Sequence, residues 1–216
     1  MASVIQFTDF TADLINFSDV HKNKMGGKAV YLKGQHDQKM LLQLPIARAP
    51  FGLSAFEDKK TGNVSYTVPL SLDDPALQET LKNIDDKVLK YVVDNSEVLL
   101  GKKMSMEVVT ELYTPLVRPS KGEYAPQLKL KVLSGRNGDF VPKAYDHLRN
   151  RVPLDTLNGG DMVHTIIDIN QIWVVDKKFG VSVRLEQVMK APSAKLDECA
   201  FAAGPEIDIP DFVESD

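Results

Sequence analysis

Basic and aromatic side chains are interleaved through the second half of this 216-residue chain, in a pattern that could bind a single-stranded nucleic acid. Lysine and arginine contact phosphates, and exposed rings stack on bases whatever their sequence. Residues 102–195 contain fifteen basic residues and ten acidic ones. The candidate nucleic-acid-binding residues are Lys102, Lys103, Arg118, Lys121, Tyr124, Lys129, Lys131, Trp173, Lys177, Lys178 and Arg184.

Several of these candidates have an equally simple structural interpretation. Lys129 and Lys131 could form the solvated face of a two-faced strand as readily as a DNA contact. Trp173 is at a strand end, where a large aromatic is more typical of a core than of a stacking platform. Tyr113 and Tyr124 flank the proline-rich, basic segment 114–122, where burial is harder, and we favour them as stacking residues.

The C-terminal segment 196–216 carries the opposite charge. It holds seven of the 30 acidic residues and no Lys or Arg, so residues 1–195 contain 26 bases and 23 acids. Acids alternating with apolar residues do not fold alone, but they offer an apolar anchor to a basic pocket on a partner, and such a tail can compete with a polyanion. An inert solubilising tail is the alternative. The candidate partner-binding residues are Asp208, Asp211, Phe212 and Glu214.

Motifs for catalysis or metal binding are not found in the sequence. It contains no GxSxG, no Walker-type loop, no GxGxxG after a strand and no HExxH, and its four histidines lack ligand-like spacing. Residues 158–161 could hold an anion through backbone amides, although a glycine pair between strands usually forms a turn. We therefore expect a protein that is not an enzyme and has no metal or cofactor.

Localisation is predicted from cysteine usage and hydropathy. The single cysteine, Cys199, has no internal partner for a disulfide, which fits a reducing compartment. No apolar run is long enough to span a membrane, and the first residues do not resemble a signal peptide. We expect an intracellular protein of the cytoplasm, nucleus or a virus factory, or one packaged in virions, with no membrane contact.

The elements that would position the candidate residues are mostly strands. A helix should begin at 73–75, where Asp74 can cap it and Pro75 fits its first turn, and continue to about Val92. A shorter helix is expected over residues 105–112. Residues 34–37 read as a hairpin-like turn, and 176–178 as the turn of the last hairpin. The expected strands cover residues 30–32, 40–44, 64–68, 127–132, 163–175 and 179–188.

This order of elements predicts a mainly β fold, an OB-like Greek-key β-barrel with one central amphipathic helix and a short second helix. A β-sandwich with one decorating helix is the alternative. We expect residues 1–195 to form a single OB-like domain with an N-terminal strand extension. Residues 196–216 then form the acidic C-terminal tail.

The chain resembles the acidic-tailed OB-fold single-stranded-DNA-binding proteins of short-tailed phages and their counterparts in nucleocytoplasmic large DNA viruses. The resemblance rests on residues 124–131 (YAPQLKLK), residues 172–185 (IWVVDKKFGVSVRL) and the acidic tail. It implies a viral protein, often a homodimer, that coats single-stranded DNA without sequence preference in replication, recombination and repair. The tail would dock onto a DNA polymerase or other replication proteins.

A virion structural or scaffolding protein of a large DNA virus is the alternative function. Such a protein would keep the fold and lose the DNA surface, so its contacts would be with proteins. A small-ligand enzyme on a β-barrel would need a pocket of converging polar groups, which the sequence does not identify.

Overall fold

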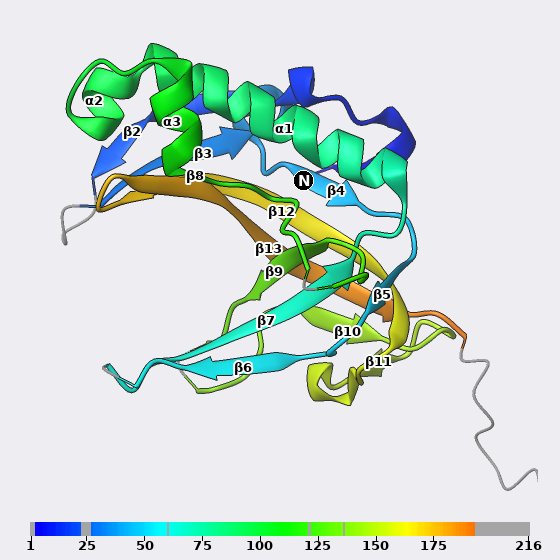
Figure 1. The fold of residues 1–216 in the computed structure, drawn as a ribbon. Coiled ribbons are helices and arrows are strands. Elements are labelled where there is room, and N and C mark those ends of the chain that lie inside the picture. Colours follow the sequence, from blue (N-terminus) through cyan, green and yellow to red (C-terminus); the bar gives the residue numbers. More distant parts are fainter. Residues whose placement is uncertain (1–2, 23–26, 60, 121, 136, 193–216) are drawn as a thin grey trace, which may run out of the picture.

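The structure, a computed structural model, describes residues 3–22, 27–59, 61–120, 122–135 and 137–192. It is mainly β, with its strands joined in one sheet and its three helices gathered on one side of it (Figure 1). The helices are α1 (Pro75–Asp94), α2 (Ser96–Leu100) and α3 (Met106–Leu112). The strands are β1 (Val4–Gln6), β2 (Asn16–Lys22), β3 (Lys28–Lys33), β4 (Leu41–Gln43), β5 (Ala47–Ala49), β6 (Ser54–Glu57), β7 (Val64–Ser71), β8 (Tyr113–Thr114), β9 (Gln127–Val132), β10 (Lys143–Tyr145), β11 (Arg151–Val152), β12 (Asp161–Val175) and β13 (Lys178–Lys190).

The long antiparallel hairpin of β12 and β13 organises the sheet. Strands β3, β4 and β5 pair with β12, whereas β8, β9 and β10 pair with β13. Asp176 and Lys177 turn the chain with positive φ angles of 49° and 68°, as a two-residue hairpin turn requires. The predicted last hairpin is therefore confirmed. The predicted turn at 34–37 is closed by an antiparallel bridge between Lys33 and Lys39 and by a 2.9 Å hydrogen bond from the Gly34 N–H to the Gln38 carbonyl. Beyond this turn, β3 and β4 each pair with β12 instead of with each other.

The prediction of a mainly β fold is confirmed, but the sheet is not closed into a barrel. Its strand order is β1-β4-β12-β13-β9-β7-β6, and the two end strands do not pair within the described residues. The reason lies at one junction. Strand β9 pairs with β13 only at Lys131 and Arg184, and β7, which continues the sheet from β9, approaches β5 without pairing with it (Figure 1).

Helix α1 forms where its cap and its apolar stripe predict it. Asp74 accepts a hydrogen bond from the backbone N–H of Ala76 at 2.9 Å, and Pro75 occupies the first turn. Helix α3 confirms the second predicted helix, and α2 was not predicted. Helix α2 has only five residues, which are too few to show a periodic spacing of apolar residues in the sequence, although Leu99 and Leu100 are buried. None of the helices in the described ranges has both the length and the apolar composition that crossing a bilayer takes.

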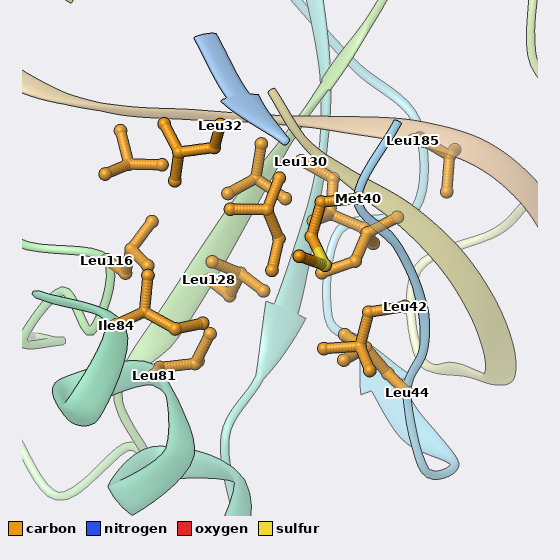
Figure 2. Close-up of a cluster of buried hydrophobic side chains, with 14 of the residues drawn as sticks. Leu32, Met40, Leu42, Leu44, Leu81, Ile84, Leu116, Leu128, Leu130 and Leu185 are labelled. Atoms are coloured by element: carbon orange, nitrogen blue, oxygen red, sulfur yellow. The ribbon is translucent and has the colours of Figure 1, made fainter. Parts of the chain in front are cut away.

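One apolar core joins α1 to the inner face of the sheet. Figure 2 shows Leu81 and Ile84 of α1 beside Leu128 of β9, and Leu42 of β4 in the same cluster. These side chains are almost completely buried, as is Leu130, two residues further along β9. Because side chains alternate along a strand, this packing leaves the other face of β9 and of the hairpin for polar residues.

Candidate nucleic-acid interface

Cationic side chains follow the face of β9 that points away from the core. Leu128 and Leu130 are buried, whereas Lys129 and Lys131 between and beyond them are exposed. Arg118 forms an antiparallel bridge with Gln127, through backbone hydrogen bonds of 3.0 and 2.8 Å, which brings it beside the start of the same face. Three of the predicted residues therefore line one strand.

Arg184 of β13 extends this cationic tract onto the hairpin. It pairs with Lys131 on one side and with Asp168 of β12 on the other, so the three side chains share a face. Asp168 accepts a hydrogen bond from Asn170 at 3.0 Å, and burial raises the pKa of its carboxyl above the usual range. The Arg184 Nε has no hydrogen-bond partner among the described residues. Arg118, Lys129, Lys131 and Arg184 are here called the β9 tract.

The N-terminal strands add residues to this face that sequence reasoning missed. Tyr31 of β3 pairs with Gln171 of β12, and the Lys33 Nζ lies 5.5 Å from the centre of the Tyr31 ring. Lys39 forms a 3.0 Å ion pair with Glu186, so its charge is largely matched. The only sequence signal for Tyr31 and Lys33 was their alternation with buried residues. Their position on the same face as the β9 tract depends on the pairing of β3 with β12, which the sequence does not show.

Phe56 is a second missed aromatic residue on this face. It belongs to β6, its side chain is 69% exposed, and it pairs with Ser65 of β7. Two residues further along β7, Thr67 pairs with Lys131. Phe56 therefore projects from the same side of the sheet as the β9 tract. The open face is defined here as the β9 tract with Tyr31, Lys33, Phe56, Asp168, Gln171, Trp173 and Ser182.

Trp173 lies across Gly180 at the hairpin end of the open face. It is half-buried and pairs with Gly180, beside which Thr114 of β8 lies in register. A Cβ atom at position 180 would lie 2.9 Å from Trp173 Cζ2 and 3.0 Å from the Thr114 carbonyl oxygen. Glycine is therefore required for the indole to lie against the backbone, and Trp173 combines packing with a partly exposed ring.

Replacing Gly180 with valine should displace the indole and lower the free energy of unfolding by about 1–3 kcal/mol, the usual cost of overpacking. Trp173 is the only tryptophan, so its fluorescence emission should shift to longer wavelengths as the ring becomes solvated. Gly135→Val is the control, because a Cβ there meets nothing closer than 3.6 Å. An unchanged emission maximum in Gly180→Val would contradict this packing.

Four predicted lysines lie apart from the β9 tract. Lys177 and Lys178 are exposed at the tip of the hairpin, where Lys177 lines a hollow together with Gly101, the residue before Lys102 and Lys103. Gly180, next to this tip, is about 13 Å along β13 from Arg184 at roughly 3.3 Å per residue. These lysines form a separate basic corner.

The remaining predicted residues fall on a loop or outside the described part of the chain. Tyr124 lies in the loop before β9 and is 77% exposed, as expected for a stacking residue. Tyr113 is different, because it is half-buried and packs against Phe179 with a ring separation of 5.1 Å. Lys121 and the tail residues Asp208, Asp211, Phe212 and Glu214 lie outside the described residues.

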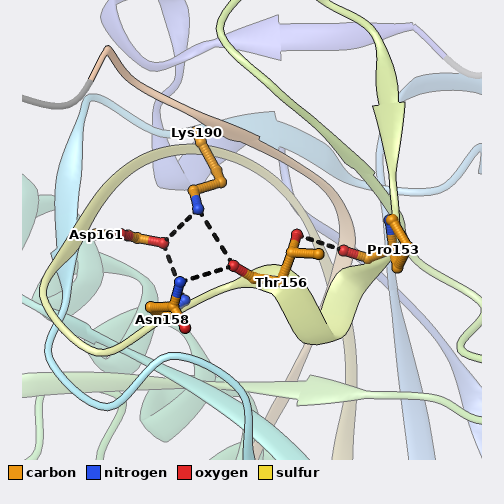
Figure 3. A network of polar contacts seen from close by, with 5 residues as sticks. All are labelled: Pro153, Thr156, Asn158, Asp161 and Lys190. Atoms are coloured by element: carbon orange, nitrogen blue, oxygen red, sulfur yellow. Dashed lines mark hydrogen bonds and ion pairs between the residues drawn. The ribbon is translucent and has the colours of Figure 1, made fainter. Parts of the chain in front are cut away.

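The glycine-containing segment 158–161 is a turn. The Asp161 carboxylate accepts a hydrogen bond from the Asn158 backbone N–H at 2.9 Å and forms a 3.0 Å ion pair with Lys190 (Figure 3). Lys190 also donates to the Thr156 carbonyl at 3.2 Å. A carboxylate of the protein thus occupies the place where an external anion would bind. No group of three His, Cys, Asp or Glu side chains in the described ranges could hold a metal ion.

Among the described carboxyl groups, Asp85 has a strongly raised pKa, and it forms a structural contact between α1 and the segment that carries Arg118. Asp85 is buried, accepts a hydrogen bond from the Tyr113 hydroxyl at 2.5 Å and another from the Leu116 backbone N–H at 3.1 Å. Burial raises the pKa of Asp85 to about 6. Because both partners lie just before Arg118, Asp85 positions the segment that leads to the β9 tract.

Several solved structures resemble the chain at low sequence identity, and no curated protein matches it. The single-stranded DNA-binding protein from bacteriophage Enc34 in complex with ssDNA is 12% identical, with a TM-score of 0.41 and coverage of 85% of this chain and 98% of that chain. The same protein without DNA is 13% identical, with a TM-score of 0.38 and coverages of 89% and 96%. Its C-terminal truncation is 13% identical, with a TM-score of 0.40 and coverages of 85% and 98%.

These three structures are all of one bacteriophage protein, and the chain is similar to them at 12–13% sequence identity. A family model matches the sequence itself over residues 58–201, which include β9, the hairpin and the whole helical layer. The chain therefore belongs to the family described as "Family of unknown function (DUF5871)".

Proposed function

We propose that this protein binds single-stranded DNA without sequence preference through its open face. The observation that carries the proposal is the β9 tract, in which Lys129 and Lys131 lie between Arg118 and Arg184 on one side of the sheet. Closely spaced cations can follow a phosphate backbone. The exposed Phe56 and the half-buried Tyr31 stand on the same side. Exposed rings stack only on bases that are not already paired and stacked in a duplex.

The acidic tail extends this proposal. Seven acids without a basic residue can compete with DNA for the β9 tract, and the apolar residues among them can dock on a basic pocket of a replication protein such as a DNA polymerase. Roles in replication, recombination and repair, and assembly as a homodimer, follow from the family resemblance of the sequence. The single cysteine suits a reducing compartment in the cell.

Binding of labelled oligo-dT of about 30 nucleotides, measured by fluorescence anisotropy across a salt series, tests the proposal. The logarithm of the binding constant should fall with the logarithm of salt concentration with a slope of about −3, since each of four contacted phosphates contributes about −0.7. A chain ending at residue 195 should bind more tightly, because it lacks the competing acids.

Duplex DNA of the same length should bind less tightly, because its bases are already paired and stacked. Single-stranded RNA of the same length is the comparison ligand that shows whether the open face distinguishes the sugar. Oligo-dT binding that is absent at low salt from both the full chain and the shortened chain would contradict the proposal. The virion structural or scaffolding role would then be the better explanation.

A further inference from the structure

A hollow of about 290 Å³ lies on β12 and β13 at the end of the hairpin opposite Trp173. Its volume is near the lower limit of small-ligand sites, which run from roughly 300 to 1,000 Å³, so it suits one ring system. Four chain segments contribute to it: β4, β10 with the loop after it, β12 and β13. The side chains used below, here called the Tyr145 pocket, are Gln43, Tyr145, Arg149, His164, Gln187 and Met189.

The register of the sheet places the Tyr145 pocket on the same face as the β9 tract. Ile166 of β12 pairs with Gln43 on one side and with Gln187 on the other. Ile166 is two residues from Asp168, which pairs with Arg184, so the two rows project from the same side. The row on the far side of Ile166 consists of Tyr145, Met189 and His164.

The polar groups of the Tyr145 pocket have few partners within the protein. Among the described residues, the side chains of Tyr145, Arg149, His164 and Gln187 make no hydrogen bond or ion pair. Gln43 Oε1 accepts one long bond of 3.4 Å from the Gln6 side chain. Two aromatic rings, two primary amides and one guanidinium therefore converge with their hydrogen-bonding capacity available to a ligand.

The walls of the pocket are held in place by hydrogen bonds on both sides. The Asp146 carboxylate accepts bonds from the backbone N–H groups of Leu148 at 2.9 Å and Asn150 at 2.8 Å, and from the Asn150 side chain at 3.0 Å. This loop holds Arg149 with a positive φ of 68°. Lys190, next to Met189, is fixed by its ion pair with Asp161 (Figure 3).

We propose that the Tyr145 pocket binds one unstacked nucleobase of the DNA strand that crosses the open face, an inference that rests on the proposed function. Tyr145 or His164 would stack on the base, and the amides of Gln43 and Gln187 would bond to its edge. The stacking contact accepts any base, and adenine is a suitable probe because a glutamine amide can donate to its N7 and accept from its N6 amino group. Arg149 would contact the adjoining phosphate.

An NMR titration of the full chain with dAMP tests the pocket without depending on oligonucleotide binding. The side-chain amide signals of Gln187 and the ring signals of His164 should shift saturably at millimolar dAMP. Gln187→Leu should weaken dAMP binding at least tenfold, as judged from the His164 signals. The matched control Gln35→Leu, an exposed glutamine outside the pocket, should bind dAMP like the unaltered chain.

Deoxyribose 5-phosphate, which lacks a base, should produce a much smaller shift of the Gln187 and His164 signals, because only its phosphate can contact Arg149. An equal shift with this compound would overturn the base pocket in favour of a simple anion contact at Arg149, and so would the absence of any saturable shift with dAMP. Oligo-dT binding measured on the same samples keeps the two proposals separate. Binding of oligo-dT without a dAMP shift would refute the pocket alone, and a dAMP shift without oligo-dT binding would refute the proposed function alone.

Discussion

Replacing Lys129 and Lys131 together with glutamine should weaken oligo-dT binding about 25-fold at about 0.1 M salt. The reason is that two phosphate contacts are lost, and each accounts for about 0.7 in the dependence of log binding constant on log salt concentration. The slope of the salt dependence should therefore become shallower by about 1.4. Both lysines are exposed on the face of β9 that points away from the core, so the variant should fold normally.

Lys82→Gln with Lys90→Gln is the matched control, because it removes the same charge from two exposed positions on α1. If the open face is the DNA-binding surface, this variant should retain nearly the full affinity and the original salt slope. Equal losses in the two double variants would mean that net charge alone governs binding. That result would remove the β9 tract from the proposed mechanism.

The part of the β9 tract that lies on β9 itself was predictable, because it depends on a local pattern. The alternation of Lys129 and Lys131 with buried leucines identifies both the strand and its polar face from the sequence alone. The apolar stripe of α1 and the last hairpin are local in the same sense. The alternative interpretation of Lys129 and Lys131, as the solvated face of a two-faced strand, describes the same geometry. A DNA-binding surface must also be solvated before the DNA binds.

The other half of the open face could not be predicted, because it is assembled by pairing between distant segments. Tyr31 meets Gln171, and Phe56 reaches the side of Lys131 through two strand pairings. Barrel closure failed as a prediction for a related reason. Whether β9 follows β13 for one residue or for five depends on sheet twist and packing, which strand periodicity does not encode.

Burial explains the misplacement of Tyr113 as a stacking residue. A tyrosine between a short helix and a proline-rich segment is predicted to be exposed. In the structure, however, the Tyr113 hydroxyl donates a hydrogen bond to Asp85 of α1. The position of Asp85 is no clearer from the sequence, because it stands next to Asp86 in a helix rich in charged residues. Only Asp86 is exposed. A buried acid that is satisfied by distant partners leaves no local pattern.

Asp85 gives the second large expected effect, a pH-dependent stability. Its pKa is raised from 3.8 to about 6 by burial, with the hydrogen bonds from Tyr113 and Leu116 opposing the shift. Between these two values the folded state binds more protons than the unfolded state, so the contribution of Asp85 to the free energy of unfolding falls as the pH rises. The full fall is on the order of 3 kcal/mol, at about 1.4 kcal/mol per pKa unit.

Asp85→Asn should remove this dependence, because asparagine does not titrate. Urea unfolding of both proteins at intervals from about pH 4 to pH 7 should show their stability difference changing by roughly 2–3 kcal/mol in favour of the variant. Asp86→Asn, at the exposed neighbouring position, should leave the pH profile of the unaltered chain intact. A difference between the unaltered chain and Asp85→Asn that stays constant over this range would show that Asp85 is ionised in both states. The contact that positions the Arg118 segment would then be an ordinary charged hydrogen bond, and its strength would not respond to mild acid.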